Sequence, residues 1–221
     1  MAIGYKLTKK QKRYIKIKRV MDLIICGCAG IVLSPVMLIL AIAIKLDSPG
    51  SVFFRQTRVT KGKEHFEILK LRTMRIDTPK NTPTHLLKSP DQYITKVGRF
   101  LRKYSLDELP QIYQVAAGTL SLVSPRPALW NQYDLIEERD KYGVNSIIPG
   151  ITGLAQIRGR DELEIAEKAR LDGEYVENLS FAMDVKCILG TIIAVIRHNG
   201  VVEGGTGEMY KKEASHETVN K

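Results

Sequence analysis

The sequence predicts an α+β fold that is mostly helical, with a membrane-embedded helix at the N-terminus, a small β-hairpin and a compact helical domain. Three observations lead to this prediction. An apolar run covers 20–46, two β-rich runs flank Thr60-Lys61-Gly62-Lys63, and apolar residues at helical spacing dominate the rest. We therefore divide the chain into a basic interfacial segment (1–19), the membrane helix, a main domain (47–200) and a polar tail expected to be flexible (201–221).

The composition indicates an anionic partner and a reducing compartment. Lysine and arginine outnumber the acidic residues by 34 to 24, and the net charge of +10 favours nucleic acid, acidic lipid or a phosphorylated substrate. No basic stripe interleaved with aromatic residues is visible, so we do not expect a nucleic-acid partner. The three cysteines lie in apolar runs, and neither they nor the scattered histidines have the spacing of a disulfide framework or a zinc site.

The apolar run over 20–46 is long enough to enter a membrane, since about 20 apolar residues span a bilayer. It exceeds the usual apolar stretch of a secretory signal peptide. Lysines and arginines crowd residues 6–19 before the run and residues 55–63 after it. Because positive residues prefer the cytoplasmic side, both flanks are expected on the same face of the membrane.

Ser34-Pro35 lies near the middle of this run. A proline inside a helix removes one backbone hydrogen bond and kinks or breaks the helix, and the Ser34 hydroxyl could satisfy the carbonyl that is released. We therefore predict a re-entrant membrane helix, broken at Ser34 and Pro35, that enters and leaves on the cytoplasmic side. The alternative is a helix that spans the membrane once and tolerates the proline.

The β-rich runs 52–56 and 66–72 predict the β-hairpin. Lys70 and Arg72 alternate in the second run, so they share one face of a strand and could hold a diphosphate. The alternative is an ordinary solvated face.

A pair of carboxylates, Asp107 and Glu108, follows a polar loop and a short basic helix that carries Arg102. Ser105 and Glu108 have the spacing of a capping box, which predicts that a helix begins at Ser105 and runs to Gly118. Asp107 would then stand at the positive end of that helix, where its ionised form is stabilised. It is a candidate nucleophile or metal ligand, and a purely structural cap is the alternative.

Arg126 lies between two prolines, in Ser124-Pro125-Arg126-Pro127. The prolines stiffen the backbone, and a guanidinium on a rigid mount suits bidentate binding of phosphate. A polyproline-like surface turn is the alternative. Further helices are expected over 128–142, 163–175 and 181–196.

Together these motifs resemble the bacterial sugar transferase family, the monotopic phosphoglycosyltransferases, in its small single-domain form. The resemblance extends from Arg19 to Ile196, and the motifs stand in the family's order. They are Lys18-Arg19 with Asp22, Ser34-Pro35, Asp47-Ser48-Pro49-Gly50, Phe54-Arg55-Gln56 with Arg58, Lys70-Leu71-Arg72-Thr73-Met74, Gly98-Arg99-Phe100-Leu101-Arg102-Lys103, Ser105-Leu106-Asp107-Glu108-Leu109-Pro110-Gln111, Ser121-Leu122-Val123, Pro125-Arg126-Pro127, Pro149-Gly150-Ile151-Thr152-Gly153, Ala155-Gln156 and Gly159-Arg160.

The resemblance implies an enzyme that moves a phosphosugar from a UDP-sugar to polyprenyl (undecaprenyl) phosphate and releases UMP. This reaction is the first membrane step of capsule, exopolysaccharide or other glycoconjugate assembly. It implies a place at the bacterial inner membrane, with a monotopic anchor and the catalytic domain on the cytoplasmic face. The expected partners are the UDP-sugar, polyprenyl phosphate and anionic membrane lipid, and the oligomeric state is left open.

Roles follow for single residues. Asp107 matches the family's nucleophilic aspartate, which points to a phosphosugar-aspartyl intermediate, and Glu108 matches its partner, which binds magnesium (Mg2+). Lys70, Arg102 and Arg126 match positions that contact substrate phosphate. The remaining assignments are Ser34 and Pro35 to the break of the membrane helix, and Arg72, Gln156, Arg158 and Arg160 to nucleotide or sugar binding.

Several positions depart from the family pattern. Many relatives have glycine where Ser124 stands, which should change the local turn but spare Arg126. Many have tryptophan where Leu154 stands and asparagine where Arg158 stands, and these two differences affect the expected sugar or lipid contacts, not the reaction. The stretches 127–133 and 153–156 resemble a capsule-assembly branch that uses an N-acetylated deoxy amino sugar.

Two other readings fit part of the sequence. A membrane-anchored basic adaptor that binds acidic lipid or nucleic acid would explain the charge, but not the carboxylates Asp107 and Glu108 among arginines. A membrane phosphatase or nucleotide-sugar hydrolase could use the same pocket. Dependence of turnover on the lipid acceptor distinguishes transfer from hydrolysis.

Overall fold

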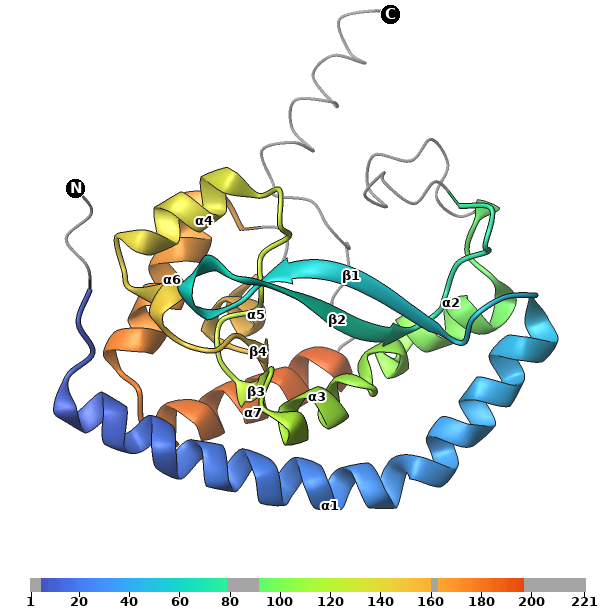
Figure 1. The fold of residues 1–221 in the computed structure, drawn as a ribbon, viewed down its shortest axis with the longest axis horizontal. Helices are drawn as coiled ribbons and strands as arrows, with labels where there is room; N and C mark the ends of the chain where they lie inside the picture. Colours follow the sequence, from blue (N-terminus) through green and yellow to red (C-terminus); the bar gives the residue numbers. More distant parts are fainter. Residues whose placement is uncertain (1–4, 79–91, 160–162, 197–221) are drawn as a thin grey trace, which may run out of the picture.

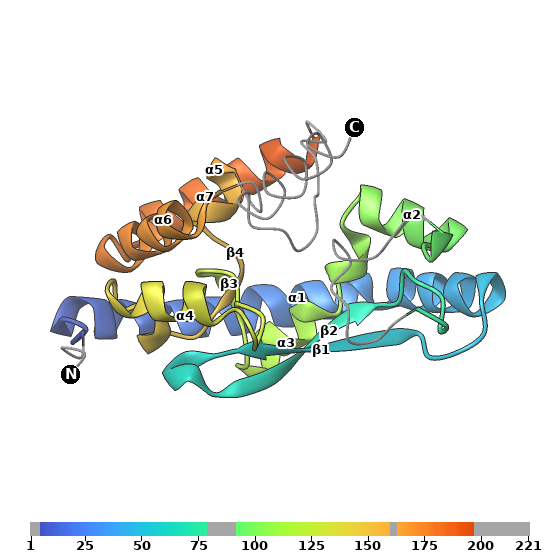
Figure 2. The same ribbon diagram turned by 90° about the horizontal axis from the view of Figure 1, so that it is seen from above.

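The computed structural model describes residues 5–78, 92–159 and 163–196. The prediction of a mostly helical protein with one long apolar N-terminal helix and a small antiparallel hairpin is confirmed (Figure 1). In Figure 2 the C-terminal helices lie on one side of the N-terminal helix and the hairpin lies on the other. The elements are α1 (Lys9–Asp47), β1 (Phe53–Val59), β2 (His65–Leu71), α2 (Lys96–Lys103), α3 (Gln111–Ala117), β3 (Ser121–Val123), α4 (Tyr133–Asp140), β4 (Gly150–Thr152), α5 (Leu154–Arg158), α6 (Ile165–Glu177) and α7 (Phe181–Ile196).

Helix α1 begins at a complete capping box, in which Thr8 and Gln11 exchange side-chain to backbone hydrogen bonds. It then continues without interruption for 39 residues through Pro35, so the break expected at Ser34-Pro35 is not seen. The Ser34 hydroxyl donates to the carbonyl of Ile31 at 2.8 Å, and this is the carbonyl that Pro35 leaves without a backbone donor. The ribbon curves in its C-terminal half (Figure 1).

Most of the apolar surface of α1 is not covered by the protein. Its most apolar 18-residue window has a mean hydropathy of 2.6, and only 11% of that window is buried, whereas a core helix would be mostly buried. Met37, Leu40 and Ile44 form the covered face, where they pack against the hairpin and α2. Within the described residues α1 is the one helix long and apolar enough to cross a membrane, and its exposure is that of a membrane-associated helix.

The N-terminal half of α1 is joined to the domain by buried polar contacts. Asp184 of α7 accepts hydrogen bonds from Lys18 at 2.6 Å and from Tyr14 and Tyr175 at 2.7 Å each. Arg19 donates to two carbonyls near the C-terminus of α3, at 2.5 and 2.8 Å. Two members of the basic segment therefore bind the domain and do not face lipid.

The middle of the chain contains two small sheets of two strands each. Strands β1 and β2 pair antiparallel from Phe53 opposite Leu71 to Val59 opposite His65, which confirms the predicted hairpin. Strands β3 and β4 pair in parallel, with Val123 opposite Thr152. The chain leaves β3 directly into the segment that carries Arg126.

Two predicted helices are shorter in the structure. Pro110 has no N–H, so the predicted helix from Ser105 to Gly118 divides into a 3-10 turn (Leu106–Glu108) and α3, although Gly118 does end it in the left-handed conformation. The helix predicted over 128–142 begins only at Tyr133, because the preceding residues pair with the end of the hairpin. The segment 181–196 forms α7 with the predicted bounds.

The first testable prediction concerns Gly98, where α2 crosses the chain after β2. A Cβ placed on Gly98 would lie 2.0 Å from the backbone oxygen of Thr73, and backbone cannot move aside easily. Gly98→Ala is expected to lower the free energy of unfolding by about 1–3 kcal/mol, because the helix must shift away. Thermal unfolding in lipid nanodiscs measures this loss.

Gly27→Ala is the matched control, since Gly27 is also helical and an added Cβ would meet no atom within 4 Å. We expect this change to leave stability unchanged or slightly higher. Equal unfolding midpoints for the two variants would contradict the close packing of α2 on Thr73.

Candidate active site

The carboxylate pair lies in a tight reversal of the chain after α2. Ser105 has φ 54° and ψ 25°, a left-handed conformation that costs a non-glycine residue roughly 1–2 kcal/mol, and its side chain caps nothing. The predicted capping box at Ser105 and Glu108 is therefore wrong. The reversal turns the next residues inward, and Asp107 is buried with 4% of its surface exposed. Strain of this kind persists where the surrounding structure demands it, often at functional sites.

Four predicted site residues meet at this turn. Lys70 of β2 reaches Glu108 with 3.0 Å between Nζ and Oε1, and the same nitrogen lies 4.0 Å from Oδ2 of Asp107. Arg126 forms a two-pronged contact with Glu108, with Nη1 at 2.9 Å from Oε2 and Nη2 on Oε1. Two carboxylates and two cations are thus packed together at a partly buried place.

Arg126 is also held by strand β4. Its Nη1 also donates to the carbonyl of Ile151 in β4 at 3.1 Å. The Arg126 side chain is one quarter exposed, so part of it remains accessible to solvent. The sequence-based alternative of a free surface turn is therefore wrong.

The charges around Glu108 keep it ionised. Burial by itself would raise the pKa of this carboxyl, but the neighbouring Arg126 and Lys70 more than offset burial and hold the pKa well below its usual range. The resulting stabilisation is present above the carboxyl's unfolded pKa and is lost as the pH falls below it. At neutral pH the cluster contains ionised Glu108 between two cations.

Arg102, the remaining candidate for phosphate binding, is hydrogen-bonded to Thr73. Its Nε donates to the Thr73 hydroxyl at 2.9 Å, which connects α2 to the chain three residues after Lys70. Thr73 has no predicted role, although it belongs to the motif Lys70-Leu71-Arg72-Thr73-Met74. No pattern indicated which side chain it would hold.

Arg72 turns away from this cluster. Its guanidinium donates to the carbonyl of Ser48 at 2.7 Å and also to that of Pro49, so it holds the C-terminal end of α1. Lys70 and Arg72 are both buried, which excludes the solvated face considered from the sequence. The two side chains were expected to share one face of a strand, but β2 ends at Leu71 and Arg72 lies beyond it.

The other sequence-based candidates lie in α5 or outside the described part of the chain. Gln156 lies in α5, and its buried carboxamide oxygen has no hydrogen-bond partner among the described residues. Arg158 is exposed at the end of the same helix. Arg160 and the tail 201–221 lie outside the described residues.

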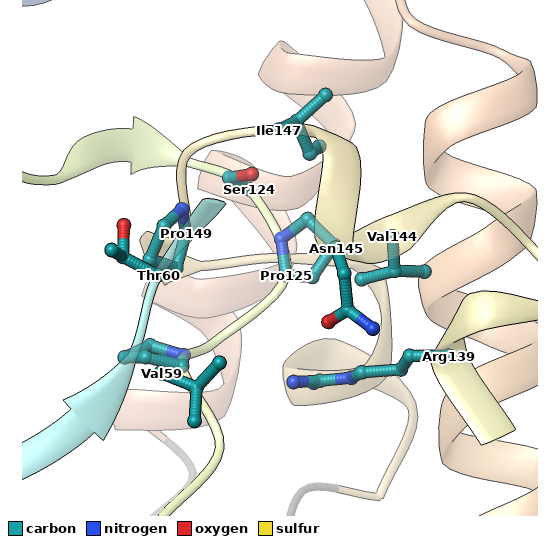
Figure 3. Close-up of a pocket in the computed structure, with 10 residues that line it drawn as sticks. Val59, Thr60, Ser124, Pro125, Arg139, Val144, Asn145, Ile147 and Pro149 are labelled. Carbon is teal, nitrogen blue, oxygen red and sulfur yellow. The ribbon is translucent and has the colours of Figure 1, made fainter. Parts of the chain in front are cut away.

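A small pocket lies behind the Arg126 segment, between the end of the hairpin and α4 (Figure 3). Its volume of about 20 Å³ has room for about one water molecule. Neither Asp107 nor Glu108 lines it, so it is not the place where a nucleotide sugar would meet these carboxylates.

The donor set for magnesium is partial. Among the described residues no three Asp, Glu, His or Cys side chains gather to form a metal site. The adjacent carboxylates Asp107 and Glu108 do supply the hard oxygen donors that Mg2+ prefers, and this ion is commonly held by one or two carboxylates together with substrate phosphates and water. The residues present therefore fit Mg2+ only when a phosphate ligand contributes as well.

Comparison with known proteins identifies a family. The family model described as bacterial sugar transferase matches residues 13–198, which is most of the chain. The matched range includes every element of the carboxylate cluster.

Curated relatives agree with this match. The chain is 40% identical to a UDP-glucose:undecaprenyl-phosphate glucose-1-phosphate transferase of Caulobacter vibrioides, over 81% of this chain and 69% of that protein. It is 36% identical to a UDP-N-acetylgalactosamine-undecaprenyl-phosphate N-acetylgalactosaminephosphotransferase of Aeromonas hydrophila, over 83% of this chain and 44% of that protein. It is 32% identical to the exopolysaccharide production protein ExoY of Rhizobium meliloti, over 83% of this chain and 87% of that protein.

The chain thus spans less than half of some relatives and most of others. The match covers the carboxylates, the phosphate-contacting candidates and the apolar helix together, which favours an enzyme over the adaptor considered from composition. The chain belongs to the bacterial sugar transferase family, and it is an enzyme of the phosphoglycosyltransferase class.

Proposed function

We propose that this enzyme transfers a sugar phosphate from a UDP-sugar to undecaprenyl phosphate and releases UMP, as a membrane step in exopolysaccharide or other glycan assembly. The observation that carries the proposal is the cluster of Asp107 and Glu108 with Lys70 and Arg126, two carboxylates and two cations in one partly buried place. Phosphoryl transfer depends mainly on positioning and charge neutralisation, which such a cluster supplies. The names of the Caulobacter and Aeromonas relatives support the same substrates.

Asp107 is the proposed nucleophile. A carboxylate oxygen attacks the phosphorus that bears the sugar, and the bond from this phosphorus to the oxygen bridging to UMP breaks. UMP leaves with the bridging oxygen and its electron pair, and a phosphosugar-aspartyl intermediate is formed. Lys70, Arg102 and Arg126 bind the phosphate oxygens on which charge gathers.

The acceptor completes the reaction. An oxygen of undecaprenyl phosphate attacks the same phosphorus, and the bond from phosphorus to Asp107 breaks. The carboxylate is regenerated, and the product is the undecaprenyl diphosphate sugar. The order explains why donor and acceptor need not lie in the site at the same time.

Magnesium is the proposed cofactor. Glu108 would hold it together with oxygens of the substrate phosphates, and its chemistry there is to neutralise phosphate charge. Arg126 contacts Glu108 in the protein without ligand, so binding of the UDP-sugar and Mg2+ would have to weaken this contact. The low pKa of Glu108 keeps its oxygens available as ionised donors.

Helix α1 is the proposed monotopic anchor at the cytoplasmic face of the inner membrane. Lys9, Lys10, Lys12, Arg13 and Lys16 are exposed on its first turns, where they can attract anionic lipid. Basic residues also follow the helix on the hairpin. A curved helix with both ends on one side satisfies both basic flanks.

The sugar itself is a separate proposal. The likeness of 127–133 and 153–156 to a capsule-assembly branch favours an N-acetylated deoxy amino sugar. The names of the Caulobacter and Aeromonas relatives specify different sugars, glucose and N-acetylgalactosamine. Lipid-dependent UMP release, measured over a panel of UDP-sugars, identifies the donor and is the assay for the variants below.

The second testable prediction concerns the intermediate. Enzyme mixed with its UDP-sugar alone should release a burst of at most about one UMP per enzyme and carry a phosphosugar adduct on Asp107, detected by mass spectrometry. Asp107→Asn should abolish adduct and turnover together. Asp77→Asn, which removes an exposed carboxylate, is the control and should retain both.

Wild-type enzyme that turns over with neither burst nor adduct would show direct displacement. Substantial turnover by Asp107→Asn would equally remove this residue from the nucleophilic role.

The third testable prediction concerns magnesium. Glu108→Gln removes the negative charge but keeps the shape, and it should lose most activity and require much more Mg2+ for what remains. Turnover is measured against Mg2+ concentration, with unfolding midpoints to confirm the fold. Glu67→Gln, which alters an exposed carboxylate on the hairpin, is the control. Identical Mg2+ dependence in wild type and Glu108→Gln would restrict Glu108 to orienting Arg126.

The fourth testable prediction concerns topology. Single cysteines at positions 5 and 61, in a protein freed of its own cysteines, should both resist an impermeant reagent in intact cells and react after permeabilisation. Pro35→Ala should shift molecules toward spanning, because a helix-interior proline costs about 3 kcal/mol. Labelling of position 5 alone from outside the wild-type cell would show that α1 crosses the membrane.

A further inference from the structure

The segment that carries Arg126 is held by its carbonyl oxygens. Pro125 and Pro127 have no N–H, so this stretch cannot be fixed by ordinary strand pairing. Its consecutive carbonyls instead accept hydrogen bonds from different elements. The donors are the Gly150 N–H to Pro125 at 3.0 Å, Arg139 Nη2 to Arg126 at 3.0 Å, Arg58 Nη1 to Pro127 at 3.1 Å and the Val59 N–H to Ala128 at 3.0 Å.

The donor to the central carbonyl belongs to a buried ion pair. Arg139 of α4 and Asp172 of α6 are 3% and 0% exposed. Nε and Nη2 of Arg139 lie 2.9 and 2.5 Å from Oδ2 of Asp172, and the same Nη2 donates to the carbonyl of Arg126. Figure 3 shows Arg139 extending from α4 along the pocket that also contains Pro125.

Stability alone is a weak explanation for this pair. Burial raises the pKa of Asp172, and only the nearby cation Arg139, with a contribution from Lys168, opposes that rise. The second oxygen, Oδ1, is buried and has no hydrogen-bond partner among the described residues. A buried ion pair can often be replaced by apolar side chains of similar volume without loss of stability. The hydrogen bond from Arg139 to the backbone carbonyl of Arg126 suggests a role for the pair other than stability.

We infer that Arg139 and Asp172 are positioning residues for Arg126: Asp172 orients the Arg139 guanidinium, and Arg139 fixes the carbonyl of Arg126 so that its side chain meets the substrate phosphates. The inference rests on the proposed function, in which Arg126 binds those phosphates. Arg139 reaches Arg126 through the backbone carbonyl of that residue, so its effect on the Arg126 side chain passes through the backbone between the two prolines.

The test replaces the pair and separates position from stability. The double variant Arg139→Met with Asp172→Leu removes both charges and keeps apolar volume, so its unfolding midpoint should stay near that of wild type. Its kcat/KM for the UDP-sugar should fall about ten- to hundredfold, because a small displacement of Arg126 costs that much. Leu135→Ala is the control: it removes a buried apolar side chain from the same helix α4 but changes neither Arg139 nor Asp172.

A second readout does not need turnover. The NMR signal of the Arg126 Nε–H, assigned by its loss in Arg126→Lys, should shift in the double variant and stay unchanged in Leu135→Ala. If the double variant fails to fold, Arg139→Lys replaces it. Lysine keeps a cation on Asp172 but has one nitrogen in place of the fork, and it should also shift the signal and lower kcat/KM.

The outcomes are distinct. Lower kcat/KM and a shifted Arg126 signal at an unchanged midpoint support the inference. Wild-type kcat/KM and an unchanged signal in a stable double variant, or equal kinetic losses in that variant and Leu135→Ala, would reduce the pair to a connection between α4 and α6. Wild-type enzyme inactive toward every UDP-sugar would overturn the proposed function, and the Arg126 signal would still decide the positioning role.

Discussion

The carboxylate of Asp184 connects the membrane-associated helix to the rest of the protein. It accepts hydrogen bonds from Lys18 and Tyr14 of α1 and from Tyr175 of α6. A buried carboxylate without such donors would be strongly destabilising, so these contacts fix how α1 crosses α6 and α7. The hairpin and α2 pack on the other half of the same helix, and the position of the carboxylate cluster follows from both attachments.

In the carboxylate cluster, Glu108 occupies the cations that are proposed to bind substrate phosphate. In the ligand-free protein Glu108 contacts both Arg126 and Lys70, and Lys70 also lies 4.0 Å from Asp107, so each cation has an anionic partner. A diphosphate can take over these contacts because it presents the same kind of anionic oxygen in greater number. In the proposed reaction, donor binding would exchange one anionic partner for another. Such an exchange limits the electrostatic stabilisation of bound substrate and favours interactions that strengthen as charge develops in the transition state.

Much of this architecture could be predicted from local sequence. Apolar periodicity located α7 with its observed bounds, and β-rich runs around a glycine turn located the hairpin. The residues of the cluster were also found, because Asp107, Glu108, Lys70 and Arg126 belong to recognisable motifs. The contacts of Arg72 could not be predicted, because its carbonyl partners lie at the end of α1, a long-range contact that strand alternation does not encode. The cap at Ser105 failed because the missing N–H of Pro110 and the left-handed turn override local propensity. Arg139 escaped notice because its use depends on a backbone carbonyl, which has no signature in sequence.

The distance along the chain between Lys18 and Asp184 has a consequence for biosynthesis. The two residues are 166 positions apart, so Lys18 leaves the ribosome long before its buried partner is made. During synthesis α1 can settle in the bilayer with this cation still hydrated at the surface, while the intervening elements form and pack. Only when α7 emerges can the last connection close. The hairpin and α2 can therefore pack on the C-terminal half of α1 first, and the contact between its N-terminal half and α7 forms last.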